Sequence, residues 1–391
     1  MDSIVTNGTL SATTLMGFAG RVGTYDRDNR FFTEDFEDLR RSGYLTINVP
    51  KEMGGQGFTL AEVGREQRRL AYHAPATALG INMHLYWIGV AADLWRAGDR
   101  SLEWILREAM KGEIFAAGHA ERGNDLPVLL STAKAEKVDG GFRFTGHKMF
   151  GSLAPVWTRY GLHGLWADAP NGPQIVHGFL PRDSMGYTIV ETWDTMGMRA
   201  TRSDDVKLDG AFVPDKYIAR TLPAGTADPF VLAVFAWALL GFGNIYCGVA
   251  QRALDLATAA VKGKTALAVS RGMAYHPEVQ HAVADMVLAF DPVAAHLDQV
   301  ARDWVEGVDH GAAWPSKIVS AKHHAVEACW KVVDGAMEVS GGAGMFRANE
   351  LERLFRDARC GRFHPANSML VHEIVAKTAL GIDLGEQPRW G

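Results

Sequence analysis

The chain is poor in cysteine. Cys247, Cys329 and Cys360 are the only three in 391 residues, and they lie far apart. No two of them form the C-x-x-C spacing of a thiolate zinc site or a redox motif. A disulfide framework is therefore excluded as the basis of the fold. We expect reduced thiols, no bound metal and a cytoplasmic protein.

The chain also lacks an excess of basic charge. Lys and Arg number 40 against 45 Asp and Glu, which gives a net charge of −5. Nucleic acids and anionic membranes attract proteins with a basic excess, so neither is predicted as a partner. The first basic residue is Arg21, so the basic start of a secretory signal is missing as well.

Common catalytic motifs are missing too. The sequence contains no G-x-S-x-G, no P-loop and no H-E-x-x-H. The glycine runs at 54–57 and 341–344 do not follow a predicted strand and open a helix, so a Rossmann dinucleotide site has little support. His323 and Glu327 have metal-compatible spacing, but such a pair is more typical of a solvated helix face.

One apolar run stands out from this ordinary composition. Residues 229–250 carry no charge over 22 positions, which is long enough to span a membrane. The run contains Gly241, Gly243 and Asn244, and no basic cluster flanks it closely on one side. A helix that is apolar on all sides is also what the centre of a helical bundle requires. We expect a buried helix rather than a membrane span.

The order of predicted elements indicates three domains. Helical spacing covers 61–72 and 76–95, with Pro75 as the break between them. Short alternating segments and a turn at 139–141 predict strands up to about residue 220. Long helices are predicted at 231–262, 277–308, 314–340 and 366–381. The predicted domains are an N-terminal helical domain at 1–112, a middle β-domain at 113–222 and a C-terminal helical bundle at 223–391.

Four segments resemble, in order and spacing, motifs of the acyl-CoA dehydrogenase superfamily. They are VPKEMGGQGFTLAE (49–62), GHKMFGS (146–152), WDTMGMRATRSDDVKLDGAFVP (193–214) and EVSGGAGMFRANELERLFRDAR (338–359). The resemblance covers nearly the whole chain. It implies an α+β multidomain fold with an N-terminal helical domain, a middle β-barrel-like domain and a C-terminal four-helix bundle. It also implies FAD and a homodimer or homotetramer.

The resemblance further assigns flavin contacts position by position. Phe150 takes the place of the aromatic residue against the flavin ring, and Ser152 that of the hydroxyl near flavin N5. The R-x-x-F-G phosphate motif is not recognisable at 266–270, although Arg271 is near, and P-A-N replaces E-G-T at 365–367. The remaining candidates come from the flavin loop, the glycine turn that receives a neighbouring subunit's FAD, and these two weakened motifs: Ala117, Gly118, Asn124, Gly341, Gly342, Arg271 and Asn367.

The position of the dehydrogenase base does not match the family. Acyl-CoA dehydrogenases remove a substrate proton with a carboxylate, which lies after the RDA motif or on the first bundle helix. Pro365 and Ala238 occupy these two positions here, and His364 precedes the first of them. Without a base in place, the proton transfer of these dehydrogenases is not expected.

A histidine in place of that carboxylate resembles the flavin-dependent monooxygenase branch of the superfamily, typified by dibenzothiophene monooxygenase, 4-hydroxyphenylacetate hydroxylase oxygenase and indole oxygenases. That likeness implies reduced FAD or FMN from a separate flavin reductase, O₂, a C4a-hydroperoxide and an aromatic or heteroatom-containing substrate. The catalytic candidates are His364, Ser152, His84 and His119.

Three alternatives stay open at this point. The protein could be an acyl-CoA or acyl-carrier-protein dehydrogenase with another base, or a non-catalytic relative. His364 could also belong to a turn that caps the last helix, with its ring bonded to backbone.

Overall fold

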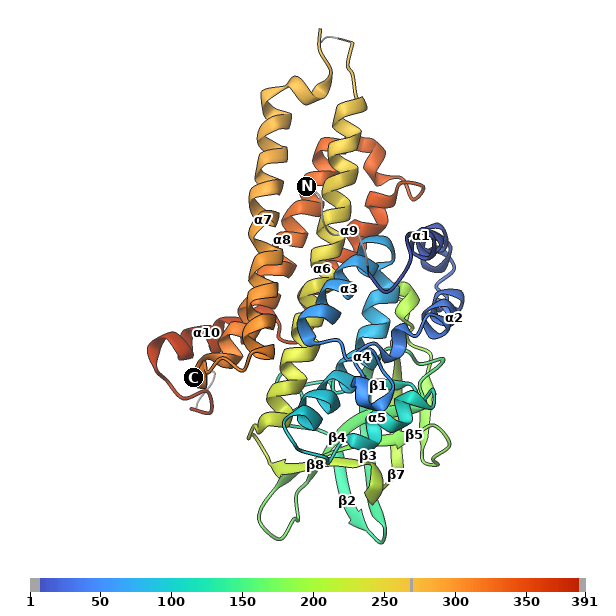
Figure 1. Cartoon of the computed structure of the whole chain (residues 1–391), viewed down its shortest axis with the longest axis vertical. Coiled ribbons are helices and arrows are strands. Elements are labelled where there is room, and N and C mark those ends of the chain that lie inside the picture. Colours follow the sequence, from blue (N-terminus) through green and yellow to red (C-terminus); the bar gives the residue numbers. More distant parts are fainter. Residues whose placement is uncertain (1–7, 268–269, 387–391) are drawn as a thin grey trace.

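Helices form the first part of the computed structural model, which describes residues 8–267 and 270–386 (Figure 1). The bounds are α1 (Ala12–Arg27), α2 (Thr33–Arg41), α3 (Leu60–His73), α4 (Pro75–Arg96) and α5 (Glu103–Met110). A capping box fixes the start of α3, because Thr59 and Glu62 each accept the other's backbone N–H. Pro75 separates α3 from α4, as the sequence predicts.

A mixed sheet of eight strands follows the first helices. The strands are β1 (Phe115–Gly118), β2 (Lys134–Val138), β3 (Gly141–Gly151), β4 (Arg159–Trp166), β5 (Gln174–Pro181), β6 (Tyr187–Val190), β7 (Asp204–Pro214) and β8 (Ile218–Pro223). Their order is β6-β7-β3-β2-β4-β5-β8, with β1 beside β4. The predicted turn joins β2 to β3, where Gly140 has a φ of 72°. Within the described residues no pair joins β6 to β8, so the sheet is not a fully closed barrel.

Long helices make up the last part of the chain. They are α6 (Pro229–Gly263), α7 (Pro277–Val305), α8 (Trp314–Ser340), α9 (Glu350–Cys360) and α10 (Ser368–Leu380). Among the described helices, only α6 is long and apolar enough to cross a membrane, yet 83% of its most apolar window is buried inside the fold. It packs against α3, α4 and α8, which is the place of a core helix.

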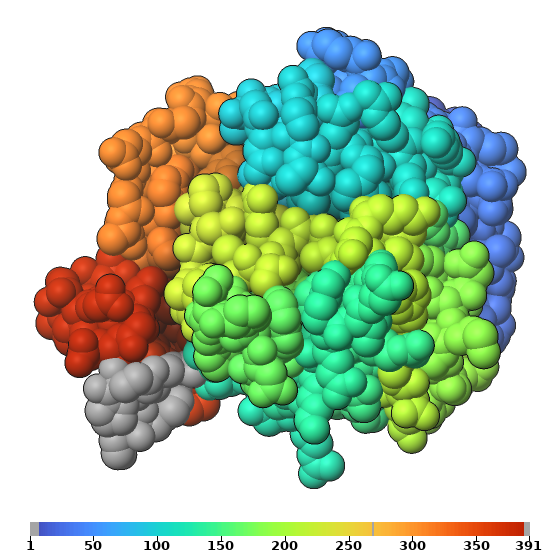
Figure 2. Space-filling model, turned by 90° about the horizontal axis from the view of Figure 1, so that it is seen from below, coloured from blue at the N-terminus to red at the C-terminus, as the bar shows by residue number. Residues whose placement is uncertain are grey.

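The arrangement confirms the predicted acyl-CoA dehydrogenase-like architecture of helices, sheet and helices. Seen from the sheet end, Figure 2 shows the strand segments over the lower part of this face and α10 standing out to one side. The buried helix α4 lies between the sheet and α6, because it contacts β1 on one side and α6 on the other. The junction of α4, α6 and β3 is where the candidate site lies.

Candidate active site

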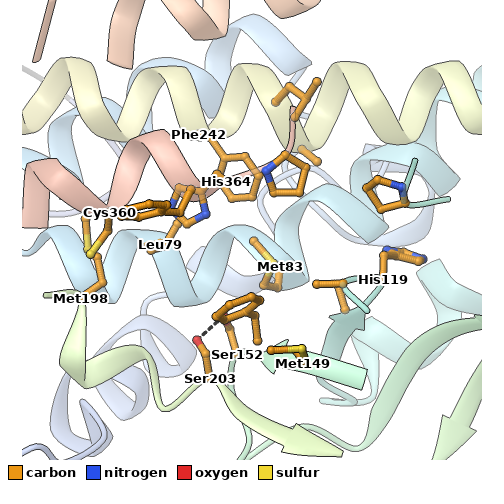
Figure 3. A pocket seen from close by; sticks show the side chains of 18 of the residues that line it. Leu79, Met83, His119, Met149, Ser152, Met198, Ser203, Phe242, Cys360 and His364 are labelled. Atoms are coloured by element: carbon orange, nitrogen blue, oxygen red, sulfur yellow. Dashed lines mark hydrogen bonds between the residues drawn. The ribbon is translucent and has the colours of Figure 1, made fainter. Parts of the chain in front are cut away.

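A cavity of about 420 Å³ lies between α4, α6, the end of β3 and the segment after α9 (Figure 3). Its wall consists almost entirely of apolar and aromatic side chains, and within the described ranges no Asp, Glu, Lys or Arg lines it. The few polar side chains in the wall include His119, Ser152, Ser203 and His364. An apolar cavity with a small number of placed polar groups suits a small, uncharged ligand.

A β-bulge shapes one wall of the cavity. The pairing of β3 with β7 is interrupted between Lys148 and Gly151, where β3 carries one residue more than its partner. Within the bulge, Phe150 adopts a φ of 58°, and its ring is 52% exposed beside Trp193. Because a bulge redirects side chains, Met149 and Phe150 both reach the cavity.

Ser152 is the first of three hydroxyls in a hydrogen-bonded row. Its Oγ lies 2.7 Å from Ser203 Oγ, which lies 2.8 Å from Thr201 Oγ1. Thr201 in turn donates to the Met198 carbonyl at 2.9 Å. A carbonyl only accepts hydrogen bonds, and each hydroxyl has one proton to donate. Once Thr201 donates to the carbonyl, the donor in each of the other two hydrogen bonds is therefore determined. Ser203 donates to Thr201, Ser152 donates to Ser203, and the lone pairs of Ser152 remain for the cavity.

His364 lies in the opposite part of the wall. Its ring is stacked on Phe242, with centroids 4.6 Å apart (Figure 3). Its Nε2 lies 2.8 Å from the Tyr246 hydroxyl. Its carbonyl accepts a hydrogen bond from Lys322 Nζ at 3.1 Å. Burial lowers the pKa of His364 to about 3, so the ring is neutral at physiological pH. The ring bonds a side chain rather than backbone.

His119 lines the cavity and also belongs to a buried group of three histidines, with His163 and His177. The centroid of its ring lies 5.1 Å from that of His163 and 6.3 Å from that of His177. Burial lowers the pKa of His119 to about 3 and those of His163 and His177 well below the usual value. Among the described residues, neither ring nitrogen of His177 has a hydrogen-bond partner, and His119 Nε2 has none either. All three rings are therefore neutral.

An ion pair lies beneath these histidines. Lys148 and Glu121 are paired with both side chains fully buried, and Lys148 Nζ also lies 3.3 Å from His163 Nδ1. Burial lowers the pKa of Lys148 to about 8, although Glu121 opposes the shift. Burial raises the pKa of Glu121, but the charge of Lys148 and hydrogen bonds outweigh it and leave the pKa below its usual value.

His84 lies outside the cavity wall. Its Nε2 lies 2.9 Å from the Leu45 carbonyl, and its Nδ1 accepts the Phe115 N–H at 3.1 Å. Both ring nitrogens are thus engaged with backbone, and burial lowers the pKa of His84 to about 4. The structure gives this histidine contacts that join α4 to its neighbours.

The flavin-contact candidates fall into two places. Ala117, Phe150 and Ser152 line the cavity, and Gly118 adjoins it, where an added Cβ would lie 2.2 Å from the Tyr160 hydroxyl. Asn124 is occupied within its own loop, because its amide donates to the Glu121 carboxylate and the Leu130 carbonyl.

The other candidates lie away from the cavity. Asn367 caps α10 by accepting the Leu370 N–H. Gly341 and Gly342 are near the far end of α6, since Lys264 Nζ donates to the carbonyl of the preceding residue. The 11 residues of α9 place about 16 Å of helix between this turn and the segment of His364. Arg271, in the segment between α6 and α7, does not line the cavity.

The two positions where the family carries its base both face the cavity. Ala238 comes from α6 and Pro365 from the segment after α9. Since neither side chain can take up a proton, the cavity offers no carboxylate for removing one from a thioester.

Several known proteins are similar to this chain over most of its length. Residues 240–369 match the model of the acyl-CoA dehydrogenase C-terminal domain. The chain is 29% identical to the putative acyl-CoA dehydrogenase YdbM of Bacillus subtilis, covering 90% of this chain and 91% of the relative. It is 28% identical to the amino sugar nitrososynthase DnmZ of Streptomyces peucetius, with 91% and 88% covered. It is also 28% identical to a dibenzothiophene monooxygenase of Rhodococcus erythropolis, with 91% and 89% covered.

Solved structures show the same fold. The FMN-bound structure of TdsC from Paenibacillus sp. A11-2 has a TM-score of 0.81 at 22% identity, covering 96% of this chain and 97% of that chain. The protein therefore has the acyl-CoA dehydrogenase fold. Its resemblance to the superfamily, and within it to the monooxygenase branch, is confirmed.

Proposed function

We propose that this protein is a monooxygenase that takes reduced flavin and O₂ and transfers one oxygen atom to a small, uncharged aromatic molecule. The observation that carries the proposal is the cavity wall, in which apolar side chains surround Ser152 and His364 and no carboxylate is present among the described lining residues. The relatives named as a dibenzothiophene monooxygenase and a nitrososynthase support an oxygenating activity.

The residues present fit a flavin ring. A largely apolar space with several aromatic side chains in its wall suits an aromatic ring system, and Ser152 offers its lone pairs to an N–H group at the edge of that ring. Reduced flavin, when bound, supplies two electrons to O₂, so that one oxygen atom reaches the substrate and the other leaves as water. The apolar walls keep bulk water from the reacting groups, and His364 lies where it can hold a proton.

The form of the flavin is the next part of the proposal. The resemblance predicts FAD, but Asn124 and Asn367, at positions assigned to its nucleotide part, are engaged within the fold. We propose that binding depends mainly on the ring and that FMN and FAD bind about equally. The FMN in the TdsC structure is consistent with this proposal.

Assembly and electron supply belong to the proposal as well. Gly341, Gly342 and Arg271 lie away from the cavity, as the resemblance implies for residues that contact the flavin of another copy of the chain. We propose a soluble homodimer or homotetramer and a separate reductase that delivers the reduced flavin.

An anaerobic assay separates the proposal from the dehydrogenase alternative. The flavin-loaded protein is mixed with a series of acyl-CoA thioesters without O₂, and the flavin absorbance is followed. No bleaching is expected, because Ala238 and Pro365 provide no base. Bleaching by an acyl-CoA would contradict the proposal. Failure to bind either flavin, oxidised or reduced, would leave only a non-catalytic role.

A further inference from the structure

The inference concerns Tyr246, which lies behind His364 as seen from the cavity. Tyr246 comes from the middle of α6 and is fully buried, and it does not line the cavity. In the described part of the chain, the only hydrogen-bond partner of its hydroxyl is His364 Nε2, at 2.8 Å. The direction of this bond decides where the proton of the imidazole lies.

Two directions are conceivable for a neutral imidazole. If Nε2–H donated to the tyrosine oxygen, the phenol proton would be buried without an acceptor. Leaving a buried donor unpaired costs about 1–3 kcal/mol. If the phenol donates to Nε2, its proton is satisfied and only acceptor capacity of the oxygen is left unused. The second direction is therefore favoured, and it leaves the proton of the ring on Nδ1.

The other ring nitrogen is not fully enclosed by the protein. His364 Nδ1 has no partner among the described residues, yet it is not among the fully buried unpaired atoms. Since His364 is part of the cavity wall, we infer that this accessible nitrogen faces the cavity. The stacked Phe242 ring and the Lys322 bond to the His364 carbonyl hold the ring and its backbone in place.

We propose that Tyr246 is a positioning residue that fixes His364 as the Nδ1–H tautomer, so that this N–H points into the cavity as a hydrogen-bond donor. The use of this N–H rests on the proposed function: during turnover it would donate a hydrogen bond to the oxygen that is being transferred. The two polar side chains in the cavity wall then have opposite roles: Ser152 accepts a hydrogen bond and His364 donates one. If the proton were on Nε2 instead, Nδ1 would present a lone pair to the oxygen and could not donate a hydrogen bond to it.

The test reads the tautomer directly, without flavin or substrate. Protein containing ring-¹⁵N histidine is studied by NMR, and the His364→Gln variant identifies the His364 signals. In wild type, Nδ1 is expected to give the signal of a protonated nitrogen and Nε2 that of an unprotonated one between pH 5 and pH 8. In Tyr246→Phe, the two signals are expected to move toward each other as the tautomers mix.

Tyr44→Phe is the matched control. The Tyr44 hydroxyl is also buried and donates to Gln67 Oε1 at 3.0 Å, but it lies outside the cavity wall. This variant should lose similar stability and leave the His364 signals unchanged. Wild-type protein with the proton on Nε2 would overturn the inference even if Tyr246→Phe failed to fold, and so would a Tyr246→Phe spectrum identical to wild type.

A second measurement is the amount of H₂O₂ released per oxygenated product during turnover. A purely structural role of Tyr246 would leave this ratio unchanged. With reduced flavin and O₂, Tyr246→Phe should release several-fold more H₂O₂ per oxygenated product than Tyr44→Phe. An equal ratio in the two variants would overturn the role of the tautomer in oxygen transfer. If the NMR result holds and no variant, wild type included, oxygenates any compound, the proposed function fails while the assigned tautomer stands.

Discussion

Two polar side chains in the cavity wall have hydrogen-bond directions that are set by the neighbouring side chains to which they are bonded. The row of Thr201 and Ser203 makes Ser152 an acceptor, and Tyr246 makes His364 a donor. In an apolar cavity such directions matter more than in water, because an unmatched polar group is not compensated by solvent.

Changing the hydroxyl row should alter the preference for reduced flavin. Reduced flavin carries an N–H where oxidised flavin has a lone pair, so an accepting Ser152 favours the reduced form. In Ser203→Ala, Ser152 is free to donate, and the ratio of the oxidised to the reduced dissociation constant should fall up to about tenfold, which corresponds to one hydrogen bond. Titration with both flavin forms measures the ratio. Ser184→Ala, which removes a hydroxyl bonded to the Phe212 carbonyl, is the control. An unchanged ratio in Ser203→Ala would disprove the direction of the row.

Removing the imidazole should uncouple the reaction. His364→Ala should fold and bind flavin, but product formation should decrease by about tenfold or more while H₂O₂ release rises. H₂O₂ and product are measured together, with His372→Ala as a control on the exposed side of α10. The same product-to-H₂O₂ ratio in His364→Ala and wild type would remove His364 from the reaction.

The buried histidines should make the protein acid-sensitive. His119, His163, His177 and His364 have pKa values lowered by burial, whereas in the unfolded chain a histidine titrates near 6.5. Below about pH 6.5 the unfolded state therefore binds more protons than the folded state. The free energy of unfolding should therefore have its full value above about pH 6.5 and should decrease as the pH falls below it.

His177→Leu isolates one of these contributions. Because neither ring nitrogen of His177 has a partner, the variant should unfold at about the same denaturant concentration as wild type at pH 7. At pH 5 it should be more stable than wild type, since the buried His177 stays neutral while the histidine of the unfolded wild-type chain takes up a proton. Denaturant unfolding at both pH values measures this, with the exposed His281→Gln as control. A large loss of stability at pH 7 would show that the His177 ring has a partner after all.

At the scale of elements, α4 and α6 pack closely against each other beside the cavity. Gly89 on α4 faces Trp237 on α6, and an added Cβ would lie 2.2 Å from the indole ring. Both helices line the cavity, so a change in the distance between them should affect ligand binding in it.

Gly89→Ala should force these helices apart. We expect a loss of about 1–3 kcal/mol in unfolding free energy, as for other overpacked cores, together with weaker flavin binding. Gly20→Ala on α1 is the matched control, because nothing lies within 4 Å of its added Cβ. That variant should be more stable by up to about 1 kcal/mol, since alanine favours a helix over glycine. Equal melting curves for the two variants would contradict the packing described.

Local signals predicted the elements well. Pro75 and the turn before β3 mark real boundaries, and the uncharged run at 229–250 is part of the buried helix α6. The helix α9 was not among the long helices predicted, since it has only 11 residues and charged side chains outnumber apolar ones.

Contacts between distant residues could not be predicted. Ser152 and Ser203 are 51 positions apart and meet only through the pairing of β3 with β7. His163 lies opposite His177 in the register of β4 and β5. A histidine inside each apolar strand was the one available signal for that pair. His84 looked similar to His119 in the sequence, and only the fold shows that its nitrogens bond backbone.

At the scale of the whole molecule, the proposed oligomer would complete the flavin site. Met345 and Phe346, beside the glycine turn, are 72% and 68% exposed in the single chain. Such apolar exposure next to a candidate flavin contact favours coverage by another copy.

Light scattering should show at least a dimer. Phe346→Asp should shift the protein toward monomer and weaken flavin binding. Met185→Asp, at a methionine before β6 that is more exposed than Phe346, should do neither. A monomeric wild type that binds flavin with full affinity would contradict the proposed assembly.

Isotope labelling tests the central claim, oxygen transfer from O₂ in this cavity, most directly. The protein is supplied with chemically reduced FMN, an uncharged aromatic compound such as indole or dibenzothiophene, and ¹⁸O₂ in ordinary water. The account predicts one ¹⁸O atom in each product molecule by mass spectrometry, and a loss of that product in His364→Ala. Product whose oxygen comes from water, or substrate desaturated without O₂, would contradict it.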